Sequence, residues 1–574
     1  MKTILFTLLL LAFNLLLISA GTVFTIKADT YHVVDKPDAL GCAPSGNDIA
    51  ADSKGKFITV LPGLGNHSRT ISTKNDSTQI YFNQGLNFYF SYHFREALAS
   101  FKEATRFDPD CAITYWGQAL AQGPYYNDYY YKMKKEVPDA VKRMTALEAV
   151  ANLTEKGLIH AMQRRYSEDL TNADRPRLDS NYASALYNLS KQYKDDNDIK
   201  ALYIDAVMLQ HKWDFWSNDG NPKPWTTELV KGCEEIIKND PGHPAALHYY
   251  IHLTEASRHP GLALHSADVL KDAMPGVGHM VHMATHMYQR NGLYAKGVSV
   301  NEDANNVNNK VDSLSPNLGI GKNSLLHIYA VQSFCAINAG MYKTGMPVYI
   351  RARNRVLDLR TSIDKDPYSQ FVYMMPVLAW VRLGKWQEIL QAPLPDAGWK
   401  YASVIDNYAK GLAYIKAKNL KAAKQCLVNI ESNLKDSLLA VRLMPFNEPV
   451  KSCKIAAAIL KGALLYEEGK SGESVAAFKN AIAEEDKLVY REPQDWIIPA
   501  RQYMGAYFLK MHKALEAEKI YKEDLIANPE NGWSLLGMYN SLSAQHKISG
   551  AAKFKARYMI AFKSADVKPV ASVF

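Results

Sequence analysis

Small and aromatic residues between 78 and 111 are spaced as in two helices that pack against each other. When Thr78 is counted as position 1, small residues fall at positions 8, 20 and 27 and aromatic residues at positions 4, 11 and 24: Gly85, Ala97, Ala104, Tyr81, Phe88 and Phe101. The small residues let two helices approach closely, and the aromatic residues fill the space around them. Pro109, at position 32, would end the second helix. The pattern predicts a helical hairpin over residues 78–111.

The same spacing returns further along the chain. Three later segments keep parts of it: Gly411, Tyr414 and Ala423; Gly462, Phe478 and Ala481; and Gly505, Ala517, Tyr521 and Pro529. Between residues 112 and 240 the period is harder to follow, but helices are expected at 138–165, 178–194 and 197–210, with a loop at 218–224. No segment shows the sustained alternation of a half-buried strand. The sequence therefore predicts an all-α fold, an α-solenoid of stacked helix-turn-helix repeats.

At these positions the chain resembles the tetratricopeptide repeat superfamily over most of its length. The resemblance extends to Asp108-Pro109-Asp110-Cys111, to Tyr115-Trp116-Gly117 and to Asn531-Gly532-Trp533. Through the segment Gly278-His279-Met280-Val281-His282-Met283, the chain is also similar to long exported bacterial repeat proteins with a G-H-x-x-H-M-x-x-H segment. The resemblance implies the solenoid fold. It implies no particular activity, because such repeats usually bind proteins or peptides.

An apolar segment opens the chain. Lys2 precedes a run from 4 to 18 that is almost wholly apolar, and Ser19-Ala20-Gly21 offers small residues to a signal peptidase. This pattern is typical of an export signal, with an uncleaved membrane anchor as the alternative. We therefore expect a signal peptide at 1–20, an irregular arm at 21–76, repeats with a histidine-rich groove at 77–355 and further repeats at 356–574. The protein is expected to be exported to the periplasm, the cell envelope or the medium.

Composition and charge limit the classes of partner that the protein is expected to bind. The 574 residues are 47% hydrophobic and 22% charged, and the formal net charge of +9 is not gathered into any block. No nucleic-acid partner is therefore expected, and a membrane is expected as a partner only if the N-terminal segment stays as an anchor. Export would place the six cysteines in an oxidising compartment. There, Cys426 and Cys453 either form a disulfide or remain small buried side chains.

Half of the histidines fall in one window. The chain has 16, and eight of them lie between residues 243 and 286. Two helix faces carry most of these, because side chains three or four residues apart share a face: His248, His252 and Glu255 on one helix, and His279, His282 and His286 on the next. The others in the window flank turns or face outward and are interpreted as incidental: His243, His259 and His265. His67 and His93 would reach the groove only if the N-terminal arm folds back.

The repeat period brings the two helix faces together. When Pro244 and Gly278 are counted as position 1 of two successive repeats, His248 and His282 both fall at position 5, and His252 and His286 both fall at position 9, 34 residues apart. Glu255 falls at position 12 and His279 at position 2. His327 falls at position 2 of the following repeat, after an expected insertion at 305–323. In tetratricopeptide arrays these positions line the concave groove, and neighbouring helices lie about 8–10 Å apart. All seven side chains are therefore expected to converge on an open groove as metal ligands.

A cluster of several imidazoles and one carboxylate is suited to a transition metal such as Cu, Fe or Zn, and Mn or Ni would also be compatible. The same donor set argues against Ca or Mg, which prefer oxygen ligands. The methionines between these histidines are expected to pack between repeats. No H-E-x-x-H, G-x-S-x-G or glycine-rich phosphate motif is present. The first hypothesis is an exported solenoid that binds metal, as a redox or hydrolytic enzyme or as a metal-handling protein. The second is a non-enzymatic adaptor that binds a protein or peptide in the groove, with the histidines as groove polars or a pH-sensitive patch.

Overall fold

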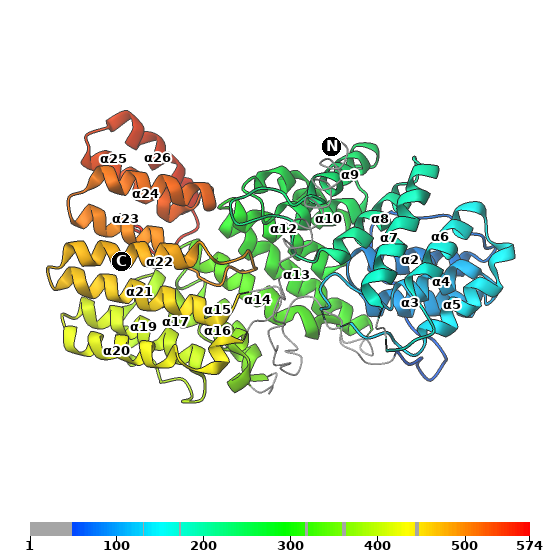
Figure 1. Ribbon diagram of the computed structural model, residues 1–574, viewed down its shortest axis with the longest axis horizontal. Helices are drawn as coiled ribbons and strands as arrows, with labels where there is room; N and C mark the ends of the chain where they lie inside the picture. Colours follow the sequence, from blue (N-terminus) through cyan, green and yellow to red (C-terminus); the bar gives the residue numbers. More distant parts are fainter. Residues whose placement is uncertain (1–48, 130, 172–173, 316–319, 359–362, 442–446) are drawn as a thin grey trace, which may run out of the picture. The chain divides into compact units, whose positions relative to one another are not determined.

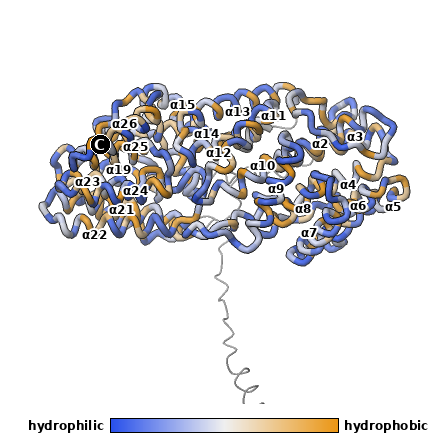
Figure 2. Tube along the Cα trace, turned by 90° about the horizontal axis from the view of Figure 1, so that it is seen from above, coloured by the Kyte–Doolittle hydropathy of each residue, from blue (hydrophilic) through white to orange (hydrophobic). Residues whose placement is uncertain are grey.

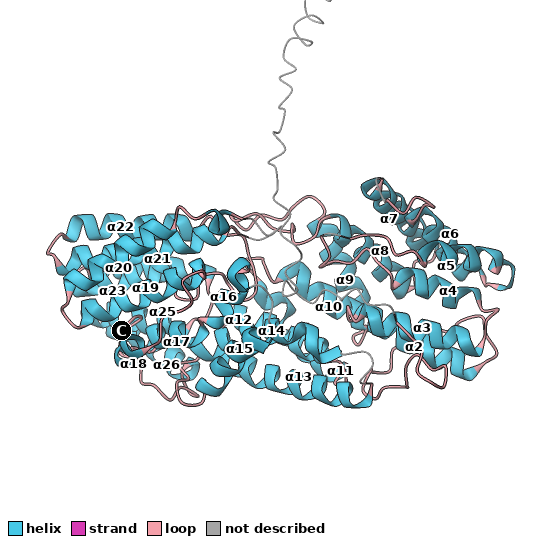
Figure 3. Cartoon of the chain, turned by 90° about the horizontal axis from the view of Figure 1, so that it is seen from below, coloured by secondary structure: helices cyan, strands magenta, loops and turns pink. Residues whose placement is uncertain are grey.

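The computed structural model describes residues 49–574 apart from 130, 172–173, 316–319, 359–362 and 442–446. Within these residues the regular structure is helical, and the only bridge between extended residues joins Trp216 to Pro222 (Figure 3). The predicted all-α fold is confirmed. The predicted signal peptide and the first part of the predicted arm lie outside the described residues, as does Cys42.

Most helices follow one another through short connections, and a few are joined by longer loops (Figure 1). The first group is α2 (Asp76–Phe90), α3 (Phe94–Phe107), α4 (Ala112–Leu120), α5 (Val137–Ala146), α6 (Leu153–Arg165), α7 (Arg175–Gln192), α8 (Asn197–Gln210), α9 (Thr226–Asn239), α10 (Pro244–Thr254), α11 (Leu264–Ala273), α12 (Gly278–Arg290) and α13 (Tyr294–Leu314). The second group is α14 (Ile320–Asn338), α15 (Met346–Asp358), α16 (Pro367–Tyr373), α17 (Met375–Arg382), α18 (Trp386–Gln391), α19 (Lys400–Lys416), α20 (Leu420–Asn433), α21 (Pro449–Glu467), α22 (Ser471–Glu485), α23 (Ala500–Lys510), α24 (Ala514–Ala527), α25 (Gly532–Ala544) and α26 (Ile548–Ala561). Short 3₁₀ turns lie at η1 (Glu148–Val150), η2 (Pro260–Ala263), η3 (Ile363–Lys365) and η4 (Ser437–Ala440).

The helices pack as hairpins, and the predicted repeat positions explain how. A Cβ atom built on Gly85, at position 8, would lie 2.7 Å from Phe101 at position 24. The same clash would occur between two later pairs at these positions, at 2.8 Å for Gly462 with Phe478 and 2.5 Å for Gly505 with Tyr521. A glycine on the first helix thus makes room for an aromatic ring on the second in three separate hairpins. These repeated contacts confirm the solenoid of helix-turn-helix repeats.

The turn inside several hairpins places position 15 in the left-handed backbone region. Gly292 and Gly469 occupy this position with φ values of 71° and 77°. Tyr92 occupies the corresponding turn between α2 and α3 with a φ of 58°. A residue with a Cβ atom in this region costs roughly 1–2 kcal/mol. The turn therefore sets the direction in which the Tyr92 side chain leaves the backbone, and this side chain lies at the functional site.

One local expectation needs correction, and the structure adds detail to another. The helix expected at 138–165 is interrupted, because Asn152 caps a new helix: its side chain accepts a hydrogen bond from the Glu155 backbone N–H, and the Glu155 carboxylate accepts one from the Asn152 N–H, both at 3.0 Å. Such a reciprocal pair starts a helix rather than continuing one. The insertion expected at 305–323 is largely helical, since α13 continues to Leu314 and α14 begins at Ile320.

Residues 49–75 contain no helix and lie against the helical hairpins. The Leu61 backbone N–H donates to the Gln84 side chain of α2 at 2.8 Å, and the Gly276 N–H donates to the Gly63 carbonyl at 2.7 Å. The described part of the predicted arm therefore folds back onto the repeats. The five cysteines within the described residues form no disulfide and are buried, Cys426 and Cys453 included.

Late segments of the chain return to its middle. Arg290, at the end of α12, donates to the carbonyl oxygen of Ala527 at 3.0 Å, and the Trp533 indole N–H donates to the Asn338 carbonyl oxygen at 3.0 Å. The loop between α22 and α23 also reaches α12, where Glu492 contacts His286; it is the orange loop beside the green α12 in Figure 1. These contacts enclose the region around α10, α12 and α14.

Hydrophobic residues are interspersed with hydrophilic ones along the helices (Figure 2). Among the helices of the described residues, none is both long and apolar enough to span a bilayer. The hydrophobic residues instead pack between helices, and Met280, Met283 and Met287 are fully buried in this way.

Candidate metal centre

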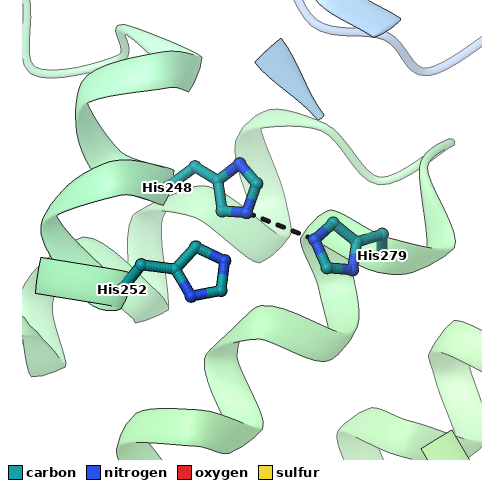
Figure 4. Close-up of side chains that lie close together, drawn as sticks. All are labelled: His248, His252 and His279. Carbon is teal, nitrogen blue, oxygen red and sulfur yellow. Dashed lines mark hydrogen bonds between the residues drawn. The ribbon is translucent and has the colours of Figure 1, made fainter. Parts of the chain in front are cut away.

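The structure brings all seven predicted ligands together. His248 and His252 lie on α10, Glu255 directly follows that helix, His279, His282 and His286 lie on α12, and His327 lies on α14. Two groups of three histidines each have ligand atoms within 4.8 Å of one another: His248, His252 and His279, named the first triad, and His282, His286 and His327, named the second triad. Glu255 lies between them and forms a third group with His252 and His286. Figure 4 shows the first triad, with the rings of α10 facing the ring of α12.

The seven side chains are buried, so the expectation of an open groove is wrong. Their exposed fractions range from 0% for His248, Glu255 and His282 to 9% for His327. Aromatic rings cover the first triad: Tyr92 lies 4.5 Å from His248 between ring centroids, and Tyr126 and Trp213 lie 5.3 and 5.8 Å from His252. The loop that carries Glu492 covers the second triad. Segments far away in sequence close the groove, and repeat positions alone could not show this.

In the first triad, two histidines are held by their Nδ1 atoms. His248 Nδ1 lies 2.7 Å from the Phe90 carbonyl oxygen, which can only accept, so Nδ1 carries the proton. His252 Nδ1 lies 3.0 Å from Glu255 Oε1. The Nε2 atom of His248 then has a free lone pair, which faces His279 Nε2 at 3.2 Å (Figure 4). His252 Nε2 is buried and has no hydrogen-bond partner among the described residues.

The second triad is held in the same manner. His282 Nδ1 lies 2.5 Å from Asn301 Oδ1. The amide group of Asn301 is oriented by its NH₂, which donates to Thr285 Oγ1 and to the Gly297 carbonyl oxygen. His282 Nδ1 must therefore be the donor. His286 Nδ1 lies 2.7 Å from Glu255 Oε2 and 2.6 Å from Glu492 Oε2. The Nε2 atoms of His282 and His286 face each other at 3.1 Å.

This arrangement fits a metal ion. Histidine ligands in metal sites usually donate the distal ring N–H to a carboxylate or carbonyl oxygen, which fixes the tautomer and turns the other nitrogen toward the ion. Four of the six histidines have that partner on Nδ1. Two nitrogens bound tetrahedrally to one ion about 2.05 Å away lie about 3.3 Å apart. The observed Nε2 separations of 3.1 and 3.2 Å are close to this value.

Burial and mutual charge set the pKa values in the metal-free chain. Burial lowers the pKa of His248 to about 3 and that of His327 to about 4, and it places those of His252, His279 and His282 well below the usual range. Neutral imidazole, the form that binds metal, is therefore favoured. Burial alone would also lower the pKa of His286, but the charges of Glu492 and Glu255 raise it to about 10.

The pKa values of the two carboxyl groups, Glu255 and Glu492, are shifted in opposite directions. Burial and the nearby charge of Glu492 raise the pKa of Glu255 well above its usual range. Burial would raise the pKa of Glu492 too, but the charge and hydrogen bond of His286 lower it. Two close carboxyl groups in a buried site cannot both ionise without a compensating cation. A bound metal ion would supply this charge.

Sequence reasoning missed Glu492 and Asn301. Asn301 had a detectable signal, because it falls at position 24, where Phe101, Phe478 and Tyr521 place rings in other repeats. Its contact with Thr285 replaces the usual glycine–ring contact between positions 8 and 24 with a hydrogen bond of 3.1 Å. Glu492 had no such signal, since it lies in a loop with no repeat register.

A cavity of about 720 Å³ adjoins the covered cluster. Its lining includes Trp213, Arg290 and Tyr490. Trp213 contacts the ring of His252, the Arg290 side chain donates to the Glu255 carbonyl oxygen at 2.9 Å, and the Tyr490 hydroxyl donates to Glu492. No histidine of the cluster is part of the lining. The cavity and the cluster are therefore separated by these few side chains.

The histidines expected to be incidental behave differently from one another. His259 and His265 are exposed. His243 flanks a turn, as expected, but is buried at 1% exposure. It lies 3.2 Å from Asp198, which also contacts His67 at 3.0 Å and Arg69 at 3.2 Å. This group of four residues, named the arm clasp, joins the arm to α8 and to the start of α10.

Comparisons with known proteins do not assign the chain to a family. No protein-family model matches the chain, and no curated protein matches it. A solved structure of the human IFIT1 dimer with m7Gppp-AAAA is 12% identical, with a TM-score of 0.31, and the match covers 86% of this chain and 91% of that one. The crystal structure of yeast Tom70 is 10% identical, with a TM-score of 0.27, and the match covers 83% of this chain and 90% of that one. The contacts within the chain itself show a solenoid of helix-turn-helix repeats.

Proposed function

We propose that this protein binds transition metal through the buried histidine cluster of α10, α12 and α14. The observation that supports it most directly is the shared orientation of four imidazoles, each with Nδ1 held by an acceptor and Nε2 turned inward. A buried lone pair without a partner, as on His252 Nε2, costs free energy unless something binds it. A metal ion would satisfy this atom and the facing Nε2 pairs together.

The donor set favours Cu, Fe or Zn, because imidazole nitrogen is a borderline ligand and one or two carboxylates accompany it. Three histidines around an ion leave a further coordination position, which a catalytic metal requires. The neighbouring cavity could bring a small molecule close to that position. Both metal-dependent roles, a redox or hydrolytic enzyme and a metal-handling protein, are compatible with this arrangement.

An adaptor role is the second candidate, since solenoids of stacked helix pairs commonly bind proteins or peptides. The histidines themselves do not support it. Their burial removes them from any surface on which a peptide would lie. A partner-binding groove would therefore use other residues.

The proposed export rests on residues 1–20 alone. Lys2 and the apolar run to residue 18 are typical of a signal peptide. The mature protein should begin near Gly21 and be found in the periplasm, the cell envelope or the medium. N-terminal sequencing of the native protein tests this, and an intact Met1 on protein from the cytosol would contradict it.

Elemental analysis tests metal binding. Protein produced with ample metal, and purified without chelator or a histidine tag, should contain stoichiometric transition metal. Replacing His252 and His286 by Ala should remove it, because one ligand is lost from each triad. The matched control replaces His67 and His243 by Ala, which also removes two histidines that carry little exposure. If the wild-type protein carries no metal and takes up none on titration, the adaptor role takes precedence.

A further inference from the structure

The two histidine triads are copies of each other, one repeat apart. The first triad uses positions 5 and 9 of one repeat and position 2 of the next: His248, His252 and His279. The second triad uses the same three positions one repeat later: His282, His286 and His327. Because successive repeats stack with nearly the same geometry, equal positions produce equal local arrangements. The clustering in space is thus a consequence of the repeat and not a chance gathering of histidines.

The hydrogen-bond pattern repeats along with the positions. At position 5, His248 and His282 each donate from Nδ1 to a neutral oxygen, of Phe90 and of Asn301. At position 9, His252 and His286 each contact Glu255 through Nδ1, one on each carboxylate oxygen. The inward contacts differ: His248 Nε2 faces His279 Nε2, at position 2, whereas His282 Nε2 faces His286 Nε2, at position 9. The two triads therefore share their repeat positions and their outer hydrogen bonds.

We infer that the cluster is a dinuclear centre, with one transition-metal ion held by each triad and Glu255 linking the two. This inference rests on the proposed metal binding and adds the number of ions and their ligands. Glu255 is suited to the link because each of its oxygens holds a histidine from a different triad. Ligand orientation in one site is then coupled to that in the other.

A single ion among His252, Glu255 and His286 is the competing arrangement, since their ligand atoms also lie within 4.8 Å of one another. An ion bound there through the Nδ1 atoms would replace their hydrogen bonds to Glu255. It would also leave the Nε2 atoms of His252, His282 and His286 facing inward without an ion. The two-ion arrangement uses every inward Nε2 and keeps the hydrogen bonds to Glu255.

The triads differ in their carboxylates. Position 12 carries Glu255 in the first repeat but Gln289 in the second. The second triad instead receives Glu492, which lies 2.6 Å from His286 Nδ1. The first triad is covered by the rings of Tyr92, Tyr126 and Trp213. The second site is therefore closer to negative charge and is expected to bind a divalent ion more tightly than the first.

The test is metal stoichiometry, measured by titrating chelator-treated protein with Zn²⁺ and, in parallel, with Cu²⁺. The full chain should take up two ions of at least one of these metals. His279→Gln should remove one ion, His327→Gln should remove the other, and the double variant should bind none tightly. Glutamine keeps most of the side-chain volume, and far-ultraviolet circular dichroism checks that each variant is folded. His265→Gln, at an exposed site, is the matched control and should keep both ions.

The outcomes separate this inference from the proposed function. One ion in the full chain, lost in His252→Gln but kept in both His279→Gln and His327→Gln, would retain metal binding and overturn the dinuclear centre in favour of the central group. No ion with either metal would overturn both proposals. If a variant unfolds, the stoichiometry of the wild-type protein still decides between one ion and two.

Discussion

The histidine cluster and the arm clasp both bring histidines and a carboxylate within coordinating distance, yet only the cluster is prepared for metal. In the clasp, His243 Nδ1 accepts a hydrogen bond from the Ala246 backbone N–H at 3.4 Å. Its proton is therefore on Nε2, which points at Asp198. For His248 and His282 of the cluster the order is reversed, because their protons lie on the outer Nδ1 atoms and their Nε2 lone pairs point inward. The distances between ligand atoms are therefore similar in the two regions, but the histidine nitrogen that faces the carboxylate in the clasp carries a proton.

The two regions also differ in the charged groups that surround their carboxylates. Arg69 binds Asp196 and Asp198 with both terminal nitrogens, which places a permanent cation inside the clasp. Burial alone would raise the pKa of Asp198, but hydrogen bonds from His243 and His67 lower it. The carboxylate is already compensated, and a metal ion would be repelled by the guanidinium. The clasp is a structural connection, whereas the two carboxyl groups of the cluster both contact a single titratable cation, His286.

Acid should produce the largest difference between the two regions. The pKa of His248 is about 3 in the folded chain, against about 6.5 when unfolded. Between these values the unfolded state binds a proton that the folded state does not, so the free energy of unfolding falls as the pH falls. His248 alone accounts for about 3 kcal/mol at about pH 4.5. His286, with a pKa of about 10, keeps its proton throughout this window.

Urea unfolding of metal-free protein between about pH 7 and 4.5 measures this effect. The clasp should contribute little, because the lowered pKa of Asp198 costs stability only below the unfolded value of about 3.9. The His67→Ala/His243→Ala variant should therefore keep the wild-type slope. A flat profile in the wild-type protein would show that the cluster histidines are not buried as neutral groups.

Metal removal should have the next largest effect. A ligand present at 100 to 1,000 times its dissociation constant stabilises the folded state by about 3–4 kcal/mol. Chelation should therefore lower the thermal midpoint of the wild-type protein and of the clasp variant alike. The His252→Ala/His286→Ala variant should not respond to chelator, and an equal response in that variant would place the metal elsewhere.

Glu255→Gln tests the carboxylate of the cluster against that of the clasp, Asp198. A glutamine can accept from only one of His252 and His286, and its NH₂ would force the other ring to carry its proton on Nε2. Loss of such an outer partner typically weakens metal affinity by about 10–100-fold. Competition with a chromophoric chelator measures the change. Asp198→Asn, the equivalent substitution in the clasp, should leave the affinity unchanged.

The smallest effect is expected from the clasp itself. Arg69→Ala removes the paired contacts to Asp196 and Asp198, which are partly buried, and should cost about 1–3 kcal/mol of local stability. Hydrogen exchange should rise at residues 61–75, while metal content stays the same. Loss of metal in this variant would show that the arm and the cluster are coupled, against the separation drawn above.

The sequence by itself determined the repeat and its register. Glycine and aromatic spacing set the hairpins, and the 34-residue period put His248 with His282 and His252 with His286 on facing helices. Asn301 could also have been predicted from the sequence, because it is a polar residue at position 24, which carries an aromatic ring in other repeats. These features follow from helix geometry, which depends on nearby residues alone.

Only the tertiary structure decided that the cluster is buried and what surrounds it. Glu492 reaches His286 from the loop between α22 and α23, and Tyr92 covers His248 from a hairpin turn near the start of the repeats. His67 and His243 meet because the arm folds back. No local periodicity encodes such contacts. They arise from the packing of segments far apart in the chain, and that packing also decides which histidine nitrogen carries the proton.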